Sequence, residues 1–227
     1  MREFGAEGLG DPPSTAEREP LAQLDELARL AIARVAPVRY GVAGSTAARE
    51  AVFRLRHRAV VERGWAAPDD LPDGLERDAD DERAVLIGGW RGEELVAAAR
   101  LIFPVPGRRL PVEAVFDLVV EPCGQIVHVD RVTVARAHSD PGSRVLLGLI
   151  GRCWLEMRER GFRLGAGIES PGVIRLFRLV GLDVTVLGPA RRYWDEDRYP
   201  IRFDPTTAMT TIRSRRAPVA SGPTHRP

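Results

Sequence analysis

The stretch from Glu121 to Gly161 limits the folds open to this chain more than any other part of the sequence. It combines a strand pattern at residues 126–134, a short loop rich in Gly, Ser and Pro, and an amphipathic helix pattern. A strand that leads through small residues into a helix presents free backbone N–H groups and the positive end of the helix dipole. Such a corner suits a phosphorylated group such as a pantetheine arm.

The strand itself carries three ionisable side chains, His128, Asp130 and Arg131, among valines and isoleucines. Alternation places His128 and Asp130 on one face and Arg131 on the other, unless a bulge re-aims one of them. Taken alone, the strand has a structural explanation, in which Asp130 and Arg131 form ion pairs and His128 is a satisfied core or rim histidine. The rest of the chain favours a functional explanation.

Composition excludes several classes of protein. At 227 residues the chain suits one domain with appendages, and the net charge of +1 gives no reason to expect nucleic acid or an anionic membrane as partner. No signal-peptide pattern is present, and no stretch approaches the roughly 18 apolar residues of a membrane span. The two cysteines, Cys123 and Cys153, make a disulfide framework improbable. We therefore predict a cytoplasmic protein without a membrane span.

Hydrophobic periodicity predicts a mixed sheet flanked by helices. A helical pattern begins at Thr15 and either packs on the domain or serves a partner, and Ser45 is a good N-cap for a second helix. Between them and the central strand lies a Pro/Gly/Asp-rich loop at residues 64–85, which alone resembles a solvated acidic loop. The remaining elements are predicted as a helix at 45–63, strands at 38–43, 84–88, 94–103, 163–168, 182–187 and 198–203, a helix or strand at 112–119, and a helix at 172–180.

This order of elements predicts one α/β (α+β) domain over residues 38–204, with a mostly antiparallel sheet. A disordered segment and the amphipathic helix occupy residues 1–37. A flexible tail occupies residues 205–227.

Four short motifs follow one another along this domain: LRHRAVVERGW, ERDADD, VAAARL and HVDR. Their order and spacing resemble the GCN5-related acyltransferase (GNAT) superfamily, and most of all its acyl-homoserine-lactone (autoinducer) synthases and the related N-acyl amino acid synthases. The likeness covers roughly residues 48–204. It implies a GNAT-like sheet whose two central strands splay apart to admit the pantetheine of an acyl donor.

The resemblance also assigns residues that bind substrate. In the first motif Arg56 and Trp65 match the family, while Val60 stands where phenylalanine is expected. Arg100 matches the arginine that ends the VAAARL strand, and Phe116 matches a downstream phenylalanine. Arg100 would hold a substrate carboxylate or orient the acidic loop. Trp65 and Phe116 would contact the acyl chain or wall the pocket, although each taken alone is more often a core residue.

The acidic motif supplies Glu76, Asp78 and Asp81, of which Glu76 belongs to the implied substrate-binding set. In HVDR, Arg131 matches a substrate-binding arginine and could pair with the acidic loop, whereas Asp130 replaces serine. His128 replaces a glutamate that is the family's candidate base and substrate anchor. The implied catalytic residues, which hold the acceptor ammonium and accept its proton, are Asp78, Asp81, His128 and Asp130.

The acyl donor is expected along the end of the central strand and the loop after it. Backbone groups of Val132, Thr133 and Val134, followed by Gly142 and Ser143, would bind pantetheine. The resemblance implies no permanently bound cofactor and no metal. The co-substrates would be an acyl thioester of acyl carrier protein or coenzyme A, and a small amine, which S-adenosylmethionine can supply.

These motifs predict an N-acyltransferase acting on an amino acid or S-adenosylmethionine. A second hypothesis is a CoA-dependent acetyltransferase of a small amine, which His138, Pro141 and Ser143 in the phosphate loop disfavour, because proline lacks an N–H donor. A third is a non-catalytic binding or dimerisation module, for which His128 and Val60 are the warning signs. Acyl length, the amine, the carrier and a homodimer are left open.

Overall fold

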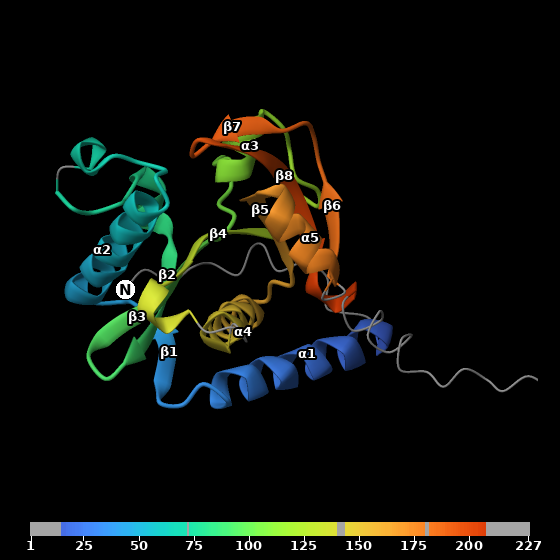
Figure 1. The fold of residues 1–227 in the computed structure, drawn as a ribbon. Coiled ribbons are helices and arrows are strands. Elements are labelled where there is room, and N and C mark those ends of the chain that lie inside the picture. Colours follow the sequence, from blue (N-terminus) through green and yellow to red (C-terminus); the bar gives the residue numbers. More distant parts are fainter. Residues whose placement is uncertain (1–14, 72, 140–143, 180–181, 208–227) are drawn as a thin grey trace, which may run out of the picture.

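Helices flank a single sheet in this protein (Figure 1). The computed structural model describes residues 15–71, 73–139, 144–179 and 182–207. The helices are α1 (Thr15–Ala33), α2 (Thr46–Glu62), α3 (Pro111–Phe116), α4 (Arg144–Glu159) and α5 (Pro171–Leu179), with short 3-10 helices η1 (Pro68–Asp70), η2 (Ala79–Arg83) and η3 (Arg136–His138). The segment at 112–119, predicted as a helix or a strand, thus contains most of α3.

The sheet has eight strands in the order β1-β2-β3-β4-β5-β8-β6, with β7 paired to β8. The strands are β1 (Val38–Val42), β2 (Val85–Arg91), β3 (Glu94–Ile102), β4 (Ile126–Val134), β5 (Leu164–Glu169), β6 (Asp183–Val186), β7 (Arg191–Tyr193) and β8 (Glu196–Asp204). Among the described strands, β4 and β5 form the one parallel pair, and the other pairings are antiparallel. The predicted mixed, mostly antiparallel α/β fold is confirmed.

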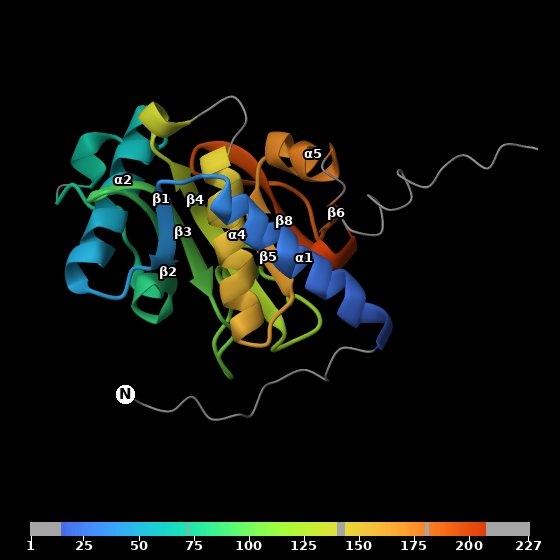
Figure 2. The ribbon, with the colours of Figure 1, turned by 90° about the horizontal axis from the view of Figure 1, so that it is seen from below.

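The two faces of the sheet are covered by different helices (Figure 2). On one face α2 and α3 enclose a core that includes Leu55 and Phe116. On the other face α4 contributes Leu149, Cys153 and Met157 to a second core. The first helix lies against α4, where Leu21, Ala28 and Trp154 form a buried cluster. Helix α1 therefore packs on the domain, which is the first of its two expected roles.

Local sequence explains where α2 begins. The Ser45 side chain accepts a hydrogen bond from the Ala48 N–H at 3.1 Å, which satisfies one of the free donors of the first turn. Apolar residues then recur on one side of the helix and bury it against the sheet. Arg56 lies on this buried side as well, so α2 carries a positive charge into the interior.

Strands β4 and β5 stay together for only three residue pairs. Their register runs from Ile126 opposite Leu164 to His128 opposite Ala166. Beyond that point β4 continues to Val134 and pairs only with β3, while β5 continues to Glu169 beside β8. The far edge of β4 thus loses its strand partner among the described residues, and the splay that the resemblance implied is present.

A bulge interrupts β4 on its other edge. Asp130 opposes Arg100 of β3, and Thr133 opposes Ala98, so that two residues of β4 oppose one of β3. Arg131 occupies this bulge with φ of 52°, a left-handed conformation that side chains with a Cβ rarely adopt. Strict alternation therefore fails here, through the bulge that the prediction for Arg131 and Asp130 named as its exception.

No described helix is both long enough and apolar enough to cross a membrane. The predicted disorder of residues 1–14 and most of the predicted flexible tail lie outside the described residues.

Candidate active site

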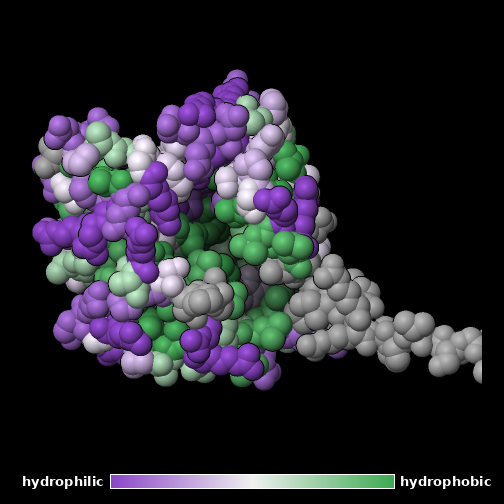
Figure 3. Space-filling view, viewed as in Figure 1, coloured by the Kyte–Doolittle hydropathy of each residue, from purple (hydrophilic) through white to green (hydrophobic). Residues whose placement is uncertain are grey.

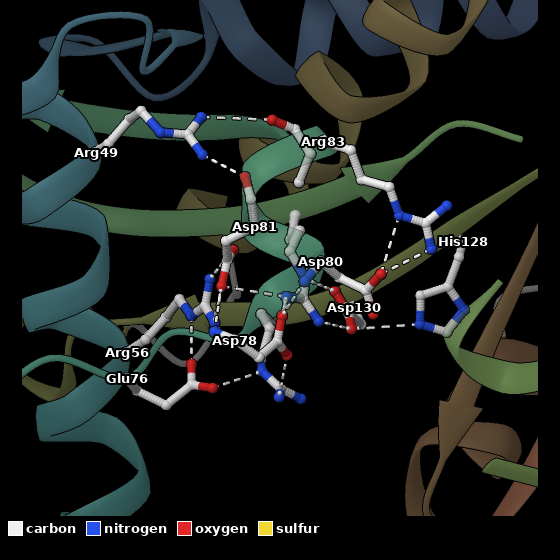
Figure 4. A network of polar contacts seen from close by, with 12 residues as sticks. Arg49, Arg56, Glu76, Asp78, Asp80, Asp81, Arg83, His128 and Asp130 are labelled. Carbon is white, nitrogen blue, oxygen red and sulfur yellow. Dashed lines mark hydrogen bonds and ion pairs between the residues drawn. The ribbon is translucent and has the colours of Figure 1, made fainter. Parts of the chain in front are cut away.

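An ion-paired cluster lies where α2, the acidic loop, β3 and β4 meet (Figure 4). We call it the carboxylate–arginine cluster. It consists of Arg56, Glu76, Asp78, Asp81, Arg100, Asp130 and Arg131. All of these residues were predicted as site residues, and the fold brings them together from four elements of the chain.

Arg56 joins α2 to the acidic loop. Its side chain is 1% exposed, bonds Glu76 through Nε, and donates from Nη1 and Nη2 to the two Asp81 oxygens at 2.7 and 3.1 Å. A guanidinium group is costly to bury unless all its charge is paired, and here two carboxylates pair with it. Because Arg56 is only 1% exposed, it holds Glu76 and Asp81 in place from the interior of the protein. That Arg56 also contacts the substrate remains a prediction.

The acidic loop is folded rather than solvated. The Asp78 side chain accepts a hydrogen bond from the Asp80 N–H at 2.9 Å, and Asp81 Oδ2 accepts one from the Asp78 N–H at 2.9 Å. These two bonds form a capping box at the start of η2. From α2, Arg49 donates to the Asp81 and Ala84 carbonyl oxygens, which fixes the loop against the helix.

Arg100 ties the loop to β4. Its Nε and Nη2 donate to the two Asp130 oxygens at 2.8 and 2.7 Å, and its Nη1 donates to Asp78 at 2.6 Å. Burial lowers the pKa of Arg100, but these hydrogen bonds and charges raise it above its ordinary value overall. With 1% exposure and all three nitrogens engaged, Arg100 orients the acidic loop, which is the second of its two expected roles.

The bulge at Arg131 brings this arginine into the same cluster. Its Nε donates to Glu76 at 3.0 Å and its Nη2 to Asp78 at 3.3 Å. It also donates to the Tyr193 hydroxyl at 3.3 Å and lies 4.8 Å from the centre of the Trp194 ring. The bulge therefore connects β4 both to the acidic loop and to the β7–β8 hairpin across the splay.

The cluster has more carboxylates than guanidinium groups, by four to three. Asp78 is the carboxylate of the cluster that solvent reaches most easily. Its side chain is 39% exposed, whereas that of Asp130 is 12% exposed. Burial raises the pKa of both carboxyls, but hydrogen bonds and charges from Arg100 lower the pKa of Asp78, and lower that of Asp130 strongly. Carboxylates held in this form attract a cation well but accept a proton poorly.

His128 is enclosed behind Asp130. Its side chain is 0% exposed, and its Nε2 lies 3.3 Å from Asp130 Oδ2. Its Nδ1 is buried and has no hydrogen-bond partner among the described residues. The two residues do share a face of β4, as alternation predicted. His128 therefore reaches the solvent side of the site only through Asp130.

The remaining predicted residues are placed differently. Phe116, at 6% exposure, belongs to the core and is covered by Arg191. Trp65 lies partly buried, donates from Nε1 to Glu196 at 3.0 Å, and carries Arg198 over its ring. Val132 is 37% exposed and Thr133 is 5% exposed on β4, while Gly142 and Ser143 lie outside the described residues.

The surroundings of both cysteines favour the neutral thiol over the thiolate. Burial raises the pKa of the Cys153 thiol to about 12, and a hydrogen bond with Glu121 raises the pKa of the exposed Cys123 thiol. Across the described ranges no group of three or more His, Cys, Asp or Glu residues could hold a metal ion.

A hollow opens on the face shown in Figure 3, between the part of the molecule that carries α2 and the part that carries β7 and β8. Hydrophobic residues form its floor and hydrophilic residues its rims. Two pockets of about 290 and 260 Å³ also flank the segment that follows β4. Each has three arginines in its lining: Arg58, Arg63 and Arg136 in the larger, and Arg34, Arg91 and Arg144 in the smaller.

Sequence reasoning missed the β7–β8 hairpin and Glu169 at the end of β5. The hairpin turn places Trp194 and Asp195 at φ of 52° and 55°, values usually taken by Gly or Asn, so the sequence held no ordinary turn signal. Alternation along β5 could have singled out Glu169, which is the one charged residue in LGAGIE.

No protein-family model and no curated protein matches the sequence. Solved structures do match. The acyl-homoserine-lactone synthase LasI superposes with a TM-score of 0.63 at 17% identity, covering 78% of this chain and 94% of that chain. BjaI, a CoA-dependent acyl-homoserine-lactone synthase solved with S-adenosylmethionine and isopentyl-CoA, gives 0.57 at 26% identity, covering 72% and 80%.

FeeM, an N-acyl amino acid synthase from uncultured soil microbes, gives a TM-score of 0.58 at 15% identity, covering 77% of this chain and 94% of that chain. The fold is therefore that of the GCN5-related acyltransferases. Its likeness to the autoinducer-synthase branch, which the four sequence motifs predicted, is confirmed.

Proposed function

We propose that this chain, which has the fold of the autoinducer-synthase branch of GCN5-related acyltransferases, is an N-acyltransferase. It moves an acyl group from a thioester of acyl carrier protein or coenzyme A to the amine of a small substrate. The observation that carries the proposal is the free edge of β4 beyond His128, which lies beside a carboxylate–arginine cluster with one carboxylate in excess. A thioester and a cationic amine would meet between these two features.

The donor side of the reaction needs hydrogen-bond donors and a path for pantetheine. Beyond His128 the β4 edge that faces β5 has no strand partner among the described residues, so its backbone groups could bind pantetheine and the thioester carbonyl. The two arginine-lined pockets flank the segment that follows this edge. Arginine suits phosphate, which both a carrier-bound and a CoA-bound pantetheine supply.

The acceptor side needs an attraction for an ammonium group. Asp78 is the most exposed carboxylate of the cluster, and its pKa is lowered, so it stays ionised at neutral pH. Its position at the N-terminus of η2 is held by Arg100 and Arg131. The acceptor would therefore be a small cationic amine, such as an amino acid or S-adenosylmethionine, the compound with which BjaI was solved.

The two competing hypotheses fare differently. A non-catalytic module has no need to bury arginines and carboxylates together, yet Arg56 and Arg100 are each 1% exposed within the cluster. The argument against a CoA-dependent acetyltransferase involves His138, which precedes the loop expected to bind the donor. Its Nε2 lies 3.3 Å from Glu94 Oε1. Pro141 and Ser143, the other two residues of that argument, lie outside the described residues.

The test is thioester consumption, measured as thiol release. Acyl-carrier-protein and acyl-CoA donors are each mixed with a panel of amino acids and with S-adenosylmethionine. We expect release that requires one amine and that prefers one donor, which identifies both substrates. A folded protein that releases no thiol with any pair would contradict the proposal.

A further inference from the structure

Glu169 is a carboxylate that the proposed reaction has not yet used. It is the last residue of β5, three residues beyond Ala166, where β4 and β5 form their last pair. Its backbone pairs with Tyr199 of β8, but among the described residues its carboxylate makes no hydrogen bond and no ion pair within 4.0 Å. In this it differs from the four carboxylates of the carboxylate–arginine cluster, each of which contacts at least one arginine.

The side chain of Glu169 lies at the gap between the two parted strands. Gly167 lacks a side chain, and a Cβ at this position would stand 3.1 Å from the Val129 carbonyl oxygen of β4 and 3.5 Å from Glu169 Oε1. The Glu169 carboxylate thus folds back over Gly167 towards β4. Any larger residue at position 167 would press on the β4 backbone and on the Glu169 side chain, so the glycine allows the two to lie close together.

The charged groups that act on Glu169 come from both neighbouring strands. Burial raises the pKa of Glu169 to about 7, Arg198 of β8 lowers it in part, and Asp130 of β4 raises it. A general base functions best when its pKa is close to the working pH. Glu169 meets this condition, whereas Asp78 and Asp130 have lowered pKa values.

We propose that Glu169 is the general base of the acyl transfer and that it accepts a proton from the acceptor ammonium at the gap between β4 and β5. The inference rests on the proposed function. It also gives a reason why a histidine can stand at position 128, because the base is supplied by the opposite strand. His128 then serves to position Asp130.

The step balances as follows. The ammonium gives one proton to the Glu169 carboxylate, and the nitrogen lone pair then forms a C–N bond with the thioester carbonyl carbon. The C–S bond breaks as the tetrahedral intermediate collapses, and its electron pair leaves with sulfur. The thiolate takes the second proton from nitrogen, which yields an amide and a free thiol, and Glu169 returns its proton to solvent.

Kinetics of three variants test the assignment. We expect Glu169→Gln to lower kcat/KM for thiol release by about 10²-fold or more. The wild-type kcat/KM should rise with pH as Glu169 ionises near 7, because only the carboxylate can accept a proton from the ammonium, and this rise should be absent from Glu169→Gln. Glu169→Asp should restore part of the rate. Glu93→Gln, in the exposed β2–β3 turn, should behave as wild type.

A second measurement does not depend on turnover. Carbon-13 NMR of the glutamate carboxyls, with the Glu169 signal assigned by its loss in Glu169→Gln, should show a titration near pH 7. A titration near the ordinary value of 4.5 overturns the inference, and so does a fully active Glu169→Gln with the wild-type pH profile. If the wild type releases no thiol with any amine, the proposed function fails and the inference fails with it.

Discussion

The carboxylates on the two sides of the splay between β4 and β5 differ in their arginine partners and in their pKa values. On the α2 side, Asp81 and Asp130 are enclosed by arginines that occupy their oxygens. On the β5 side, no arginine in the described part of the chain pairs with the Glu169 carboxylate, and Arg198 only reduces the effect of burial on its pKa. Pairing lowers a carboxyl pKa and fixes its charge, whereas burial without pairing raises the pKa and lets the charge change near neutral pH. One side is suited to hold a cation and the other to accept its proton.

The largest effect on stability should follow from disrupting the carboxylate–arginine cluster on the α2 side. Arg56→Ala removes the buried guanidinium that pairs with both Glu76 and Asp81, and breaking such a buried pair costs about 3–5 kcal/mol of unfolding free energy, although Arg131 and Arg100 still contact these carboxylates. Urea denaturation measures it. The matched control is Arg54→Ala, which removes an exposed pair with Glu50 on the same helix and should cost at most about 0.5 kcal/mol. Equal costs for the two variants would show that the cluster is not a stabilising unit.

The contribution of Glu169, on the β5 side, to the free energy of unfolding should depend on pH. Because the folded-state pKa of Glu169 is raised from 4.5 to about 7, its contribution to stability is complete below pH 4.5 and is lost as pH rises through 7. Glu169→Gln should therefore gain stability relative to wild type between pH 4.5 and 8, by up to about 3 kcal/mol. Urea denaturation of both proteins at pH 4.5 and at pH 8 tests this. If the stability difference between variant and wild type is the same at both pH values, Glu169 does not have a raised pKa.

Asp78 should affect substrate binding more than stability. Asp78→Asn removes the excess carboxylate of the cluster, so we expect KM for the amine to rise about tenfold, equivalent to roughly 1.4 kcal/mol, with a smaller change in kcat. Asp73→Asn, whose side chain is 71% exposed in a pair with Arg77, is the control and should leave KM unchanged. An unchanged KM in Asp78→Asn would mean that the cluster is not where the amine binds.

The smallest effect on stability should come from removing the hydrogen bond by which Trp65 joins the two sides of the splay. Trp65 donates to Glu196 of β8, and Trp65→Phe should remove this hydrogen bond at a cost of about 0.5–1.5 kcal/mol in unfolding free energy. Trp90→Phe controls for the smaller ring, because the Trp90 side chain makes no hydrogen bond within the described ranges. If both variants cost the same, the Trp65–Glu196 bond does not help to join the two sides.

Much of the fold follows from local signals in the sequence. Ser45 marks the start of α2 because its hydroxyl caps the first turn, and the run of β-branched residues marks both ends of β4. Alternation correctly placed His128 beside Asp130. These features depend on neighbouring residues alone, which a single sequence displays.

What the sequence could not show depends on distant contacts. The bulge at Arg131 places a bulky side chain at positive φ, and partners that stabilise it there come from the acidic loop and from β7. The acidic loop resembles a solvated segment until Arg56 and Arg100, from α2 and β3, neutralise it. The likeness to acyltransferases identified the cluster residues, but their burial and pairing are set by tertiary structure.

The central claim is that an amide bond forms between the two sides of the splay. Mass spectrometry of the reaction mixture tests this most directly, because thiol release alone does not distinguish acyl transfer from hydrolysis. We predict an N-acylated amine that appears only when donor and amine are both present, and that forms about 10²-fold more slowly with Glu169→Gln. Free carboxylic acid as the sole product, or no product from a folded protein with any donor and amine, would contradict the claim.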